Sequence, residues 1–278
     1  MTALRTDQCL VCGTSGASES RLDDLLRRCP TCTFTWTTRV LAAPEELYDS
    51  GYFEGDGYDD YYQPTARRFE SRLRLRWLRS SGPVLSLVEA GSAGGFFVAA
   101  ARAAGIAAEG VEISESAVAY ARDQLGVPVR QGPFESAEFA ERFDVVCAFH
   151  VLEHVSDPTE FLLAAREALS PGGRIAVEVP NIASAAAGRL GSSWPHIQPQ
   201  YHWWHFTPES LRRLVVDCGF EIVRQDTVFS RFYWQPLARK RNARDLFIAD
   251  LAASHSVRMT HPSMGDAVRL IARRSPDE

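Results

Sequence analysis

Four of the six cysteines in this 278-residue sequence form two close pairs with the spacing of a metal site. The pairs are Cys9-x2-Cys12 and Cys29-x2-Cys32, with sixteen residues between them. Each pair places two sulfurs on one tight turn, and two such turns complete the tetrahedral set of four thiolates that suits zinc. The alternative is a disulfide or redox pair, which is disfavoured because no secretion signal opens the sequence. We therefore predict a structural zinc ion on Cys9, Cys12, Cys29 and Cys32, with no coordination position open for catalysis.

A loop of small residues has the composition of a cofactor-binding turn. Residues 88–96 read as the end of a strand, a small-residue loop and the start of a helix. Small residues let a ligand approach backbone N–H groups closely. A pyrophosphate-binding fingerprint needs a third glycine where this sequence has Phe96, so the loop fits that fingerprint poorly. It fits the shorter G-x-G-x-G form, with Gly91, Ala93 and Gly95 at the three positions.

An acidic residue stands at the end of the next apolar run. Glu112 follows Gly91 by 21 residues. A carboxylate in this place can accept hydrogen bonds from both hydroxyls of a ribose. The alternative is a plain turn with a surface glutamate. Because the loop and the acid each come at a strand end, we interpret them as one cofactor site.

Histidines provide the candidates for acid–base chemistry. His202 and His205 lie in an aromatic segment, residues 198–209, just before Thr207-Pro208, which predicts the start of a helix. We expect this segment to form a loop over the carboxyl ends of the sheet, where ligands bind. A histidine there can take a proton from a substrate. The alternative is that both histidines hold the loop by hydrogen bonds.

The elements that position these residues follow from the hydrophobic pattern. Apolar runs at residues 84–90, 108–113, 127–131, 144–149 and 174–179 alternate with helical segments at 95–104, 116–125 and 158–168. This alternation predicts an α/β, Rossmann-like and mostly parallel sheet with helices on both faces. Residues 221–226 and 267–273 read as a hairpin-like end, so the last strand is predicted to be antiparallel.

The predicted domain organisation has three parts. Residues 1–45 form the small N-terminal zinc knuckle, residues 46–80 a tyrosine-rich lid with a linking helix over 64–79, and residues 81–278 the cofactor-binding domain. An insertion near 232–266 interrupts the last domain and carries a cluster of arginines. The lid could also be an aromatic domain interface, and both interpretations can hold. The arginines could meet a phosphate or carboxylate of the substrate, but a solvated helix face is favoured.

Residues 84–273 resemble the class I S-adenosylmethionine (SAM)-dependent methyltransferases. The landmarks are Glu89-Ala-Gly91-Ser-Ala-Gly-Gly95, Glu112, Phe143–Val155 and Leu169-Ser-Pro-Gly-Gly-Arg174. The segment Phe149–His154 is similar to the ubiquinone-biosynthesis-like branch. The paired cysteines with the segment Tyr48–Phe53 resemble a subgroup that includes nucleotide-sugar C-methyltransferases.

The resemblance implies residue roles. It implies that the cofactor-binding residues are Glu89, Gly91, Ala93, Gly95, Glu112, Ile113, Phe134, Glu135 and His150. Within this set, Glu112 would hold the ribose, and Phe134, with the displaced acid Glu135, would lie beside adenine. In related sugar enzymes a histidine of a comparable segment acts as base, and His202 aligns best with it. The candidate catalytic residues are therefore His202, His205 and His150, whereas His154 resembles a loop-shaping element.

Composition and charge argue against nucleic acid and membranes as binding partners. The net charge of −5 gives no basic field for nucleic acid, and no apolar run reaches the roughly 18 residues that span a bilayer. We expect a cytoplasmic SAM-dependent methyltransferase (EC 2.1.1 class) with a small-molecule acceptor, sugar-like or a natural product. O-methylation is favoured, and C- or N-methylation remains open. The rivals are an NAD-dependent oxidoreductase, which Phe96 disfavours, a zinc-knuckle binding protein, and a methyltransferase fold without catalysis.

Overall fold

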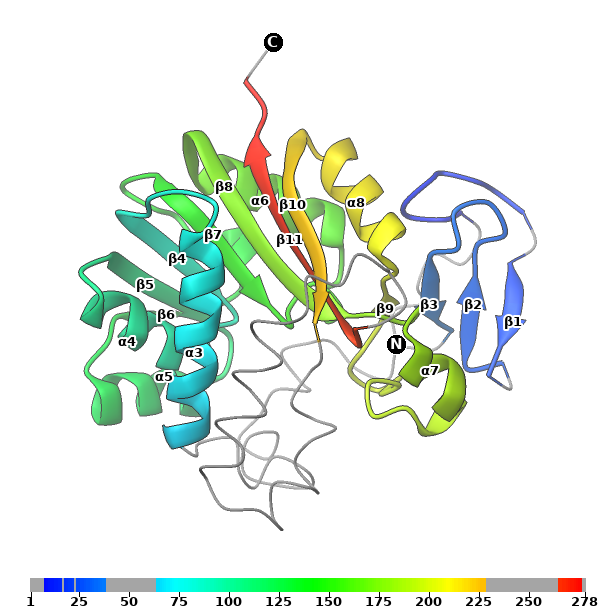
Figure 1. The fold of residues 1–278 in the computed structure, drawn as a ribbon, viewed down its shortest axis with the longest axis horizontal. Coiled ribbons are helices and arrows are strands. Elements are labelled where there is room, and N and C mark those ends of the chain that lie inside the picture. Colours follow the sequence, from blue (N-terminus) through cyan, green and yellow to red (C-terminus); the bar gives the residue numbers. More distant parts are fainter. Residues whose placement is uncertain (1–7, 17, 23, 39–63, 229–264, 277–278) are drawn as a thin grey trace.

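The computed structural model describes residues 8–16, 18–22, 24–38, 64–228 and 265–276, and it contains two sheets (Figure 1). The larger sheet has seven strands in the order β10-β11-β8-β7-β4-β5-β6, and the smaller has four in the order β1-β2-β3-β9. The tyrosine-rich segment before residue 64, and the insertion up to residue 264 with its arginines, lie outside the described residues.

The large sheet confirms the predicted strand directions. Its parallel strands are β4 (Ser86–Ala90), β5 (Ala107–Glu112), β6 (Val129–Gln131), β7 (Phe143–Phe149) and β8 (Leu169–Pro180). The last strand, β11 (Ala267–Arg274), is antiparallel both to β8 and to its other neighbour, β10 (Phe220–Val228). The sheet is therefore Rossmann-like with an antiparallel last strand, as the pattern predicted.

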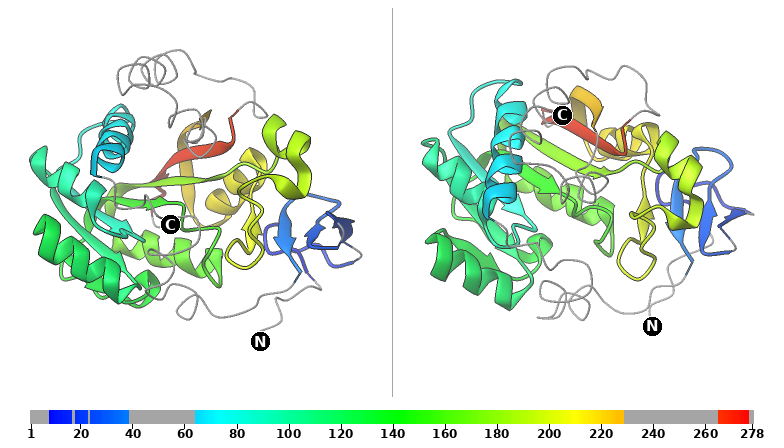
Figure 2. Two further views of the ribbon diagram at one scale, coloured as in Figure 1. Left: turned by 90° about the horizontal axis from the view of Figure 1, so that it is seen from below. Right: turned by 60° about the horizontal axis from the view of Figure 1, so that its bottom comes forward.

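Helices cover both faces of this sheet (Figures 1 and 2). They are α3 (Pro64–Arg79), α4 (Phe96–Ala103), α5 (Glu115–Tyr120), α6 (Pro158–Ala168) and α8 (Pro208–Asp217). The short helix α7 (Ala185–Leu190) lies instead beside the small sheet (Figure 1). Strand β7 shows how the faces divide, because successive strand side chains point to opposite sides. Val145 and Cys147 pack in the apolar cluster that contains α3 and α4. Val146 and Ala148 pack in the cluster that contains α6 and α8.

Local capping explains where the helices on the second face begin. The Asp157 carboxylate accepts hydrogen bonds from the first two free N–H groups of α6, and Pro158 occupies its first position. Thr207 forms a capping box with Ser210 at the start of α8, again with proline first. None of the described helices is both long and apolar enough to cross a membrane.

The small sheet joins two distant parts of the chain. Strands β1 (Glu19–Arg21), β2 (Leu26–Arg28) and β3 (Thr35–Thr37) form an antiparallel ladder, to which β9 (Trp204–His205) is added. Hereafter, residues 8–38 are called the knuckle module. Phe34 is fully buried against the rings of Trp36, Trp204 and Phe206 at centroid distances of 6.2, 5.8 and 5.5 Å. The module therefore shares its core with the segment after β8, and the domain limits at 45 and 80 stay predictions.

Candidate functional site

The four cysteines of the knuckle module lie together. Two Sγ–Sγ distances, Cys9 to Cys32 and Cys12 to Cys29, are 3.5 Å, and all four sulfurs lie within 4.8 Å of one another. Zinc–sulfur bonds of roughly 2.3 Å in a tetrahedron place the sulfurs about 3.8 Å apart. The cluster can therefore hold one zinc ion with little rearrangement.

Both knuckles have the same backbone geometry. The N–H of Gly13 donates to the carbonyl of Cys9 (2.8 Å), and the N–H of Thr33 donates to the carbonyl of Cys29 (3.0 Å). Gly13 and Thr33 both have a positive φ, 68° and 62°. Two copies of one turn thus present the two pairs of sulfurs.

The predicted cofactor loop joins β4 to α4 and is tied to Glu112 at the end of β5. Gly91 has a φ of 62°, and a Cβ there would lie 2.5 Å from Cγ2 of Val151, so only glycine fits. The N–H of Ala93 donates to Oε2 of Glu112 (2.8 Å), and the N–H of Ser114 donates to Oε1 (2.9 Å). The loop and the acid predicted from spacing are therefore in direct contact.

Buried acidic and hydroxyl groups surround this loop. Burial raises the pKa of Glu112 despite the backbone hydrogen bonds that it accepts. A carboxylate offers about four acceptor positions, so Glu112 retains capacity for further donors such as ribose hydroxyls. Burial also raises the pKa of Glu89 well above its ordinary value. Oε2 of Glu89 and Oγ of Ser92 are buried without a hydrogen-bond partner among the described residues, as expected of atoms that face a polar ligand.

The other predicted cofactor residues flank the loop or follow β6. Gly95 precedes α4 with a φ of 77°, and Ile113 is half-buried after β5. Phe134 is buried in a short 3₁₀ turn after β6, where its ring lies 5.2 Å from that of Phe161. Glu135 is half-buried beside it. Their roles in binding adenine stay predictions.

His150 lies between two carboxylates at the end of β7. Its Nδ1 is 3.1 Å from Oε1 of Glu153, and its Nε2 is 3.2 Å from Oε1 of Glu178. Burial alone would lower the pKa of His150, but the hydrogen bonds and charges of Glu153 and Glu178 raise it to about 10. Arg74 of α3 also binds Glu178, at 2.7 Å. At neutral pH His150 is therefore an imidazolium, which suits hydrogen-bond donation better than proton abstraction.

His202 lies in a second, neutral group of imidazoles. Its Nδ1–H donates to the carbonyl of His196 (2.8 Å), and Nδ1 of His154 likewise donates to the carbonyl of Tyr201 (3.0 Å). Burial lowers the pKa of His202 well below its ordinary value. The ligand atoms of Glu153, His154 and His202 lie within 4.8 Å of one another, so this group can pass a proton or hold a cation.

His205 belongs to β9, where it faces Thr35 of the knuckle module. The hydroxyl of Thr37 donates to the carbonyl of His202 (2.7 Å) and accepts from Nε2 of His205 (3.1 Å). Burial lowers the pKa of His205 to about 4. The segment expected to be a loop thus contains a two-residue strand, and its histidines hold that strand to the module.

Comparison with known proteins decides the family. A family model described as a methyltransferase domain matches residues 58–225, which is more than half of the chain. The chain belongs to this methyltransferase family.

Relatives and solved structures agree with the assignment. A ubiquinone biosynthesis O-methyltransferase of Cereibacter sphaeroides is 35% identical over 125 residues, 42% of this chain and 49% of the relative. Its counterpart in Caulobacter vibrioides is 33% identical over 141 residues, 46% and 56% of the two chains. The chain spans about half the length of the curated relatives it matches.

Two solved methyltransferases share the fold. A SAM-dependent methyltransferase of Thermotoga maritima, titled a possible histamine N-methyltransferase, has a TM-score of 0.55 and 20% identity, covering 78% of this chain and 94% of the other. The magnesium protoporphyrin IX methyltransferase of Synechocystis PCC 6803, solved with S-adenosylhomocysteine (SAH), has a TM-score of 0.56 and 17% identity, covering 83% and 98%.

Four residues that contact the histidines or their partners were not predicted from the sequence: Arg74, Glu178, His196 and Thr37. Glu178 carried a usable signal, because it is the only charged residue between Arg174 and Pro180 in an otherwise apolar strand. A charge inside a buried strand needs a partner. The others carried no such signal, because distant elements bring them to the histidines.

Proposed function

We propose that this chain transfers a methyl group from SAM to a small-molecule acceptor, with oxygen as the favoured atom. Membership of the methyltransferase family supports methyl transfer over the hydride transfer of an NAD enzyme. The names of the O-methyltransferase relatives support oxygen, and a sugar-like or natural-product acceptor fits the resemblance of the cysteine pairs. C- and N-methylation remain alternatives, since the Thermotoga protein is described as a possible histamine N-methyltransferase. One observation carries the proposal most: Glu112 is fixed beneath the Gly91–Gly95 loop with acceptor positions to spare.

The residues around the loop suit the parts of SAM. Gly91, Ala93 and Gly95 would lie along its methionine part, and Glu112 would accept from its ribose hydroxyls. Oε2 of Glu89, which is buried without a hydrogen-bond partner in the described part of the chain, would suit the ammonium group of the methionine part, since a cation would favour the ionised form of Glu89. When bound, SAM supplies a methyl group on a sulfonium, which is already a good electrophile.

For an acceptor that must lose a proton, His202 is the proposed base. It is neutral, and its Nδ1–H is committed to a carbonyl, so Nε2 carries the lone pair. Its low pKa makes it a weak base and favours an acidic hydroxyl. The imidazolium of His150 would orient Glu153 and Glu178 and add positive charge to the pocket, while His205 would anchor β9. Zinc on the four cysteines would have a purely structural role, because four thiolates fill its coordination sphere.

A matched pair of variants tests the cofactor site. Glu112→Gln and Glu109→Gln make the same change on one strand, but Glu109 is bound to the half-exposed Arg130 away from the loop. Hydrogen bonds to charged groups contribute roughly 1.5–3 kcal/mol, so Glu112→Gln should weaken SAH binding about 10- to 100-fold. Glu109→Gln should leave the affinity within about twofold.

Isothermal titration calorimetry with SAH measures these affinities, and circular dichroism checks folding. Full affinity in Glu112→Gln would remove this residue from the site. Affinity of the wild type for NAD instead of SAH would overturn the proposed function, and absence of both would favour the zinc-knuckle binding protein.

A further inference from the structure

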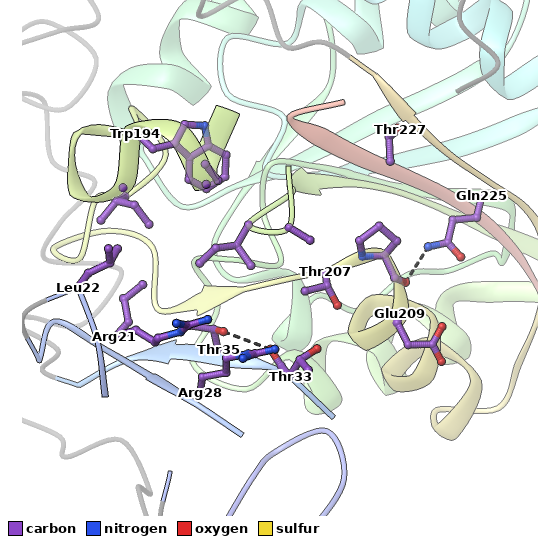
Figure 3. A pocket seen from close by; sticks show the side chains of 18 of the residues that line it. Arg21, Leu22, Arg28, Thr33, Thr35, Trp194, Thr207, Glu209, Gln225 and Thr227 are labelled. Atoms are coloured by element: carbon purple, nitrogen blue, oxygen red, sulfur yellow. Dashed lines mark hydrogen bonds between the residues drawn. The ribbon is translucent and has the colours of Figure 1, made fainter. Parts of the chain in front are cut away.

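A cavity of about 790 Å³ lies between the knuckle module and the rest of the methyltransferase (Figure 3). One side is formed by the ends of β1 and β2, and the other by the segment after β8, the start of α8 and the end of β10. The residues that line it do not include Glu112 or the Gly91–Gly95 loop. Its volume falls within the roughly 300–1,000 Å³ typical of small-molecule sites, which often lie between domains.

The module side of the cavity is cationic. In the antiparallel β1–β2 pair, Arg21 faces Leu26 and Glu19 faces Arg28, so both arginines share one face of the ladder. Both line the cavity, and Figure 3 shows their side chains on the module side of it. Arg28 makes a 3.3 Å ion pair with the exposed Glu19, and Arg21 makes no ion pair with any described residue. Arg21 is therefore available to an anion, and Arg28, which contacts Glu19 through one nitrogen, keeps further N–H donors for it.

The rest of the cavity lining is apolar, on the module side at Leu26, which faces Arg21, and on the other side at Ile182 and Trp194. Leu26 and Ile182 contribute apolar wall, and Trp194 is only 1% exposed. The indole N–H of Trp194 has no hydrogen-bond partner among the described residues, as is also the case for Trp36, Trp77 and Trp203. The rings of Trp194 and His196 meet edge to face at a centroid distance of 5.0 Å, so this wall of the cavity adjoins the histidines.

Two carboxylates also line the cavity, away from the arginines. Asp226 is already paired with Arg224 and Arg269, at 2.7 and 2.9 Å. Glu209 lies in the first turn of α8, and Figure 3 shows it on the far side from Arg21. The cavity is thus polarised, with the unneutralised positive charge at the module end.

We propose that this cavity is a second binding site, distinct from the cofactor loop, for an organic anion with an apolar body. A phosphate or carboxylate would bind between Arg21 and Arg28, and the apolar body would lie against Leu26, Ile182 and Trp194. The anion is either part of the methyl acceptor or a separate regulatory metabolite, since the recognition chemistry is the same. Binding here does not depend on the proposed methyl transfer.

The test uses 1-naphthyl phosphate as the anionic ligand and 1-naphthol as its neutral counterpart, titrated into full-length, zinc-loaded protein saturated with SAH. Saturation with SAH excludes binding in the cofactor site. We expect the phosphate to bind and the naphthol to bind at least tenfold more weakly. The double variant Arg21→Ala/Arg28→Ala should lower the affinity for the phosphate at least tenfold, because both charge-assisted contacts are lost.

Two further variants test whether the phosphate binds in this cavity and not elsewhere on the surface. Arg27→Ala is the matched control: Arg27 lies on the other face of β2, paired with Asp24, and should leave the affinity within twofold. Gly188→Leu adds a side chain to the cavity wall on α7, where a Cβ meets nothing within 4 Å and leucine favours the helix. It should abolish binding of the phosphate while SAH affinity is unchanged.

Several results would overturn the site. They are absence of phosphate binding, displacement of the phosphate by SAH, equal binding of naphthol, or equal loss in Arg27→Ala. If binding is found, steady-state kinetics with any methylated acceptor separates the sources. Competition between naphthyl phosphate and the acceptor assigns the cavity to the acceptor, and noncompetitive inhibition or activation assigns it to a regulator.

Discussion

The charge on His150 gives the sharpest prediction. Its ring nitrogens face Glu153 and Glu178, both buried, and Arg74 contacts the same oxygen of Glu178, Oε1, as His150 does. We predict that His150 stays protonated through neutral pH and loses its proton near pH 10. The perturbation is Glu178→Gln, which removes one negative charge and keeps the shape of the side chain.

The magnitude follows from the two distances. At an effective dielectric constant of about 20, opposite charges 3.1–3.2 Å apart attract by roughly 5 kcal/mol, so two carboxylates supply about 10 kcal/mol. The rise in pKa from 6.5 to about 10 corresponds to about 5 kcal/mol, and burial removes the difference. Loss of one carboxylate charge should therefore lower the pKa of His150 by about two units or more.

Nuclear magnetic resonance of protein labelled at histidine Cε1 measures the pKa of His150 directly. One of the seven histidines should keep its imidazolium shift up to about pH 9, and His150→Asn should remove that signal. Glu178→Gln should move the midpoint down, whereas Glu167→Gln, an exposed change on α6, should not. If no histidine stays protonated above pH 8, the two carboxylates do not hold the proton and the reasoning fails.

The same shift predicts how stability depends on pH. The folded-state pKa of His150 lies above the unfolded value, so its contribution is complete below about pH 6.5 and is lost as pH rises towards 10. Urea unfolding at pH 7 and pH 9.5 should show a larger loss of stability in the wild type than in His150→Asn. An equal loss in both proteins would contradict the shift.

Two further predictions concern the knuckle module. Phe34→Ala should lower the free energy of unfolding by about 3–5 kcal/mol, measured in urea, because Phe34 is fully buried among aromatic rings, and Phe34→Leu should cost less. A metal assay should find about one zinc per chain, and chelation should change the fluorescence of Trp204, because β9 is paired with the module. A metal-free folded protein with disulfide-linked cysteines would contradict the zinc site.

The sequence predicted best what local signals control. Helix 64–79 has the same bounds in the structure, as does helix 158–168, because their ends are marked by Arg79, Asp157 and Pro158 and their faces by regular spacing. The contact between the loop and Glu112 was also predictable, since parallel strands β4 and β5 bring their carboxyl ends together.

Long-range contacts were not predictable. Strand β9 has two residues, too few for a visible alternation, and exists only because β3 offers it an edge. Arg74 and Glu178 are 104 residues apart, and the sequence around either residue does not indicate that they pair. These contacts depend on how the elements pack. The raised pKa of His150 depends on them, because Glu178 is one of its two carboxylate partners.

The knuckle module is tied to the rest of the chain by hydrogen bonds from β3 and β9. The turn at Cys29 leads directly into β3. The hydroxyl of Thr37 in β3 contacts the backbone carbonyl of His202 and the imidazole ring of His205. The indole of Trp204 in turn donates to the carbonyl of Val155, after β7. A zinc ion bound to the four cysteines would therefore also fix the segment that carries the proposed base, which gives the predicted metal site a structural role.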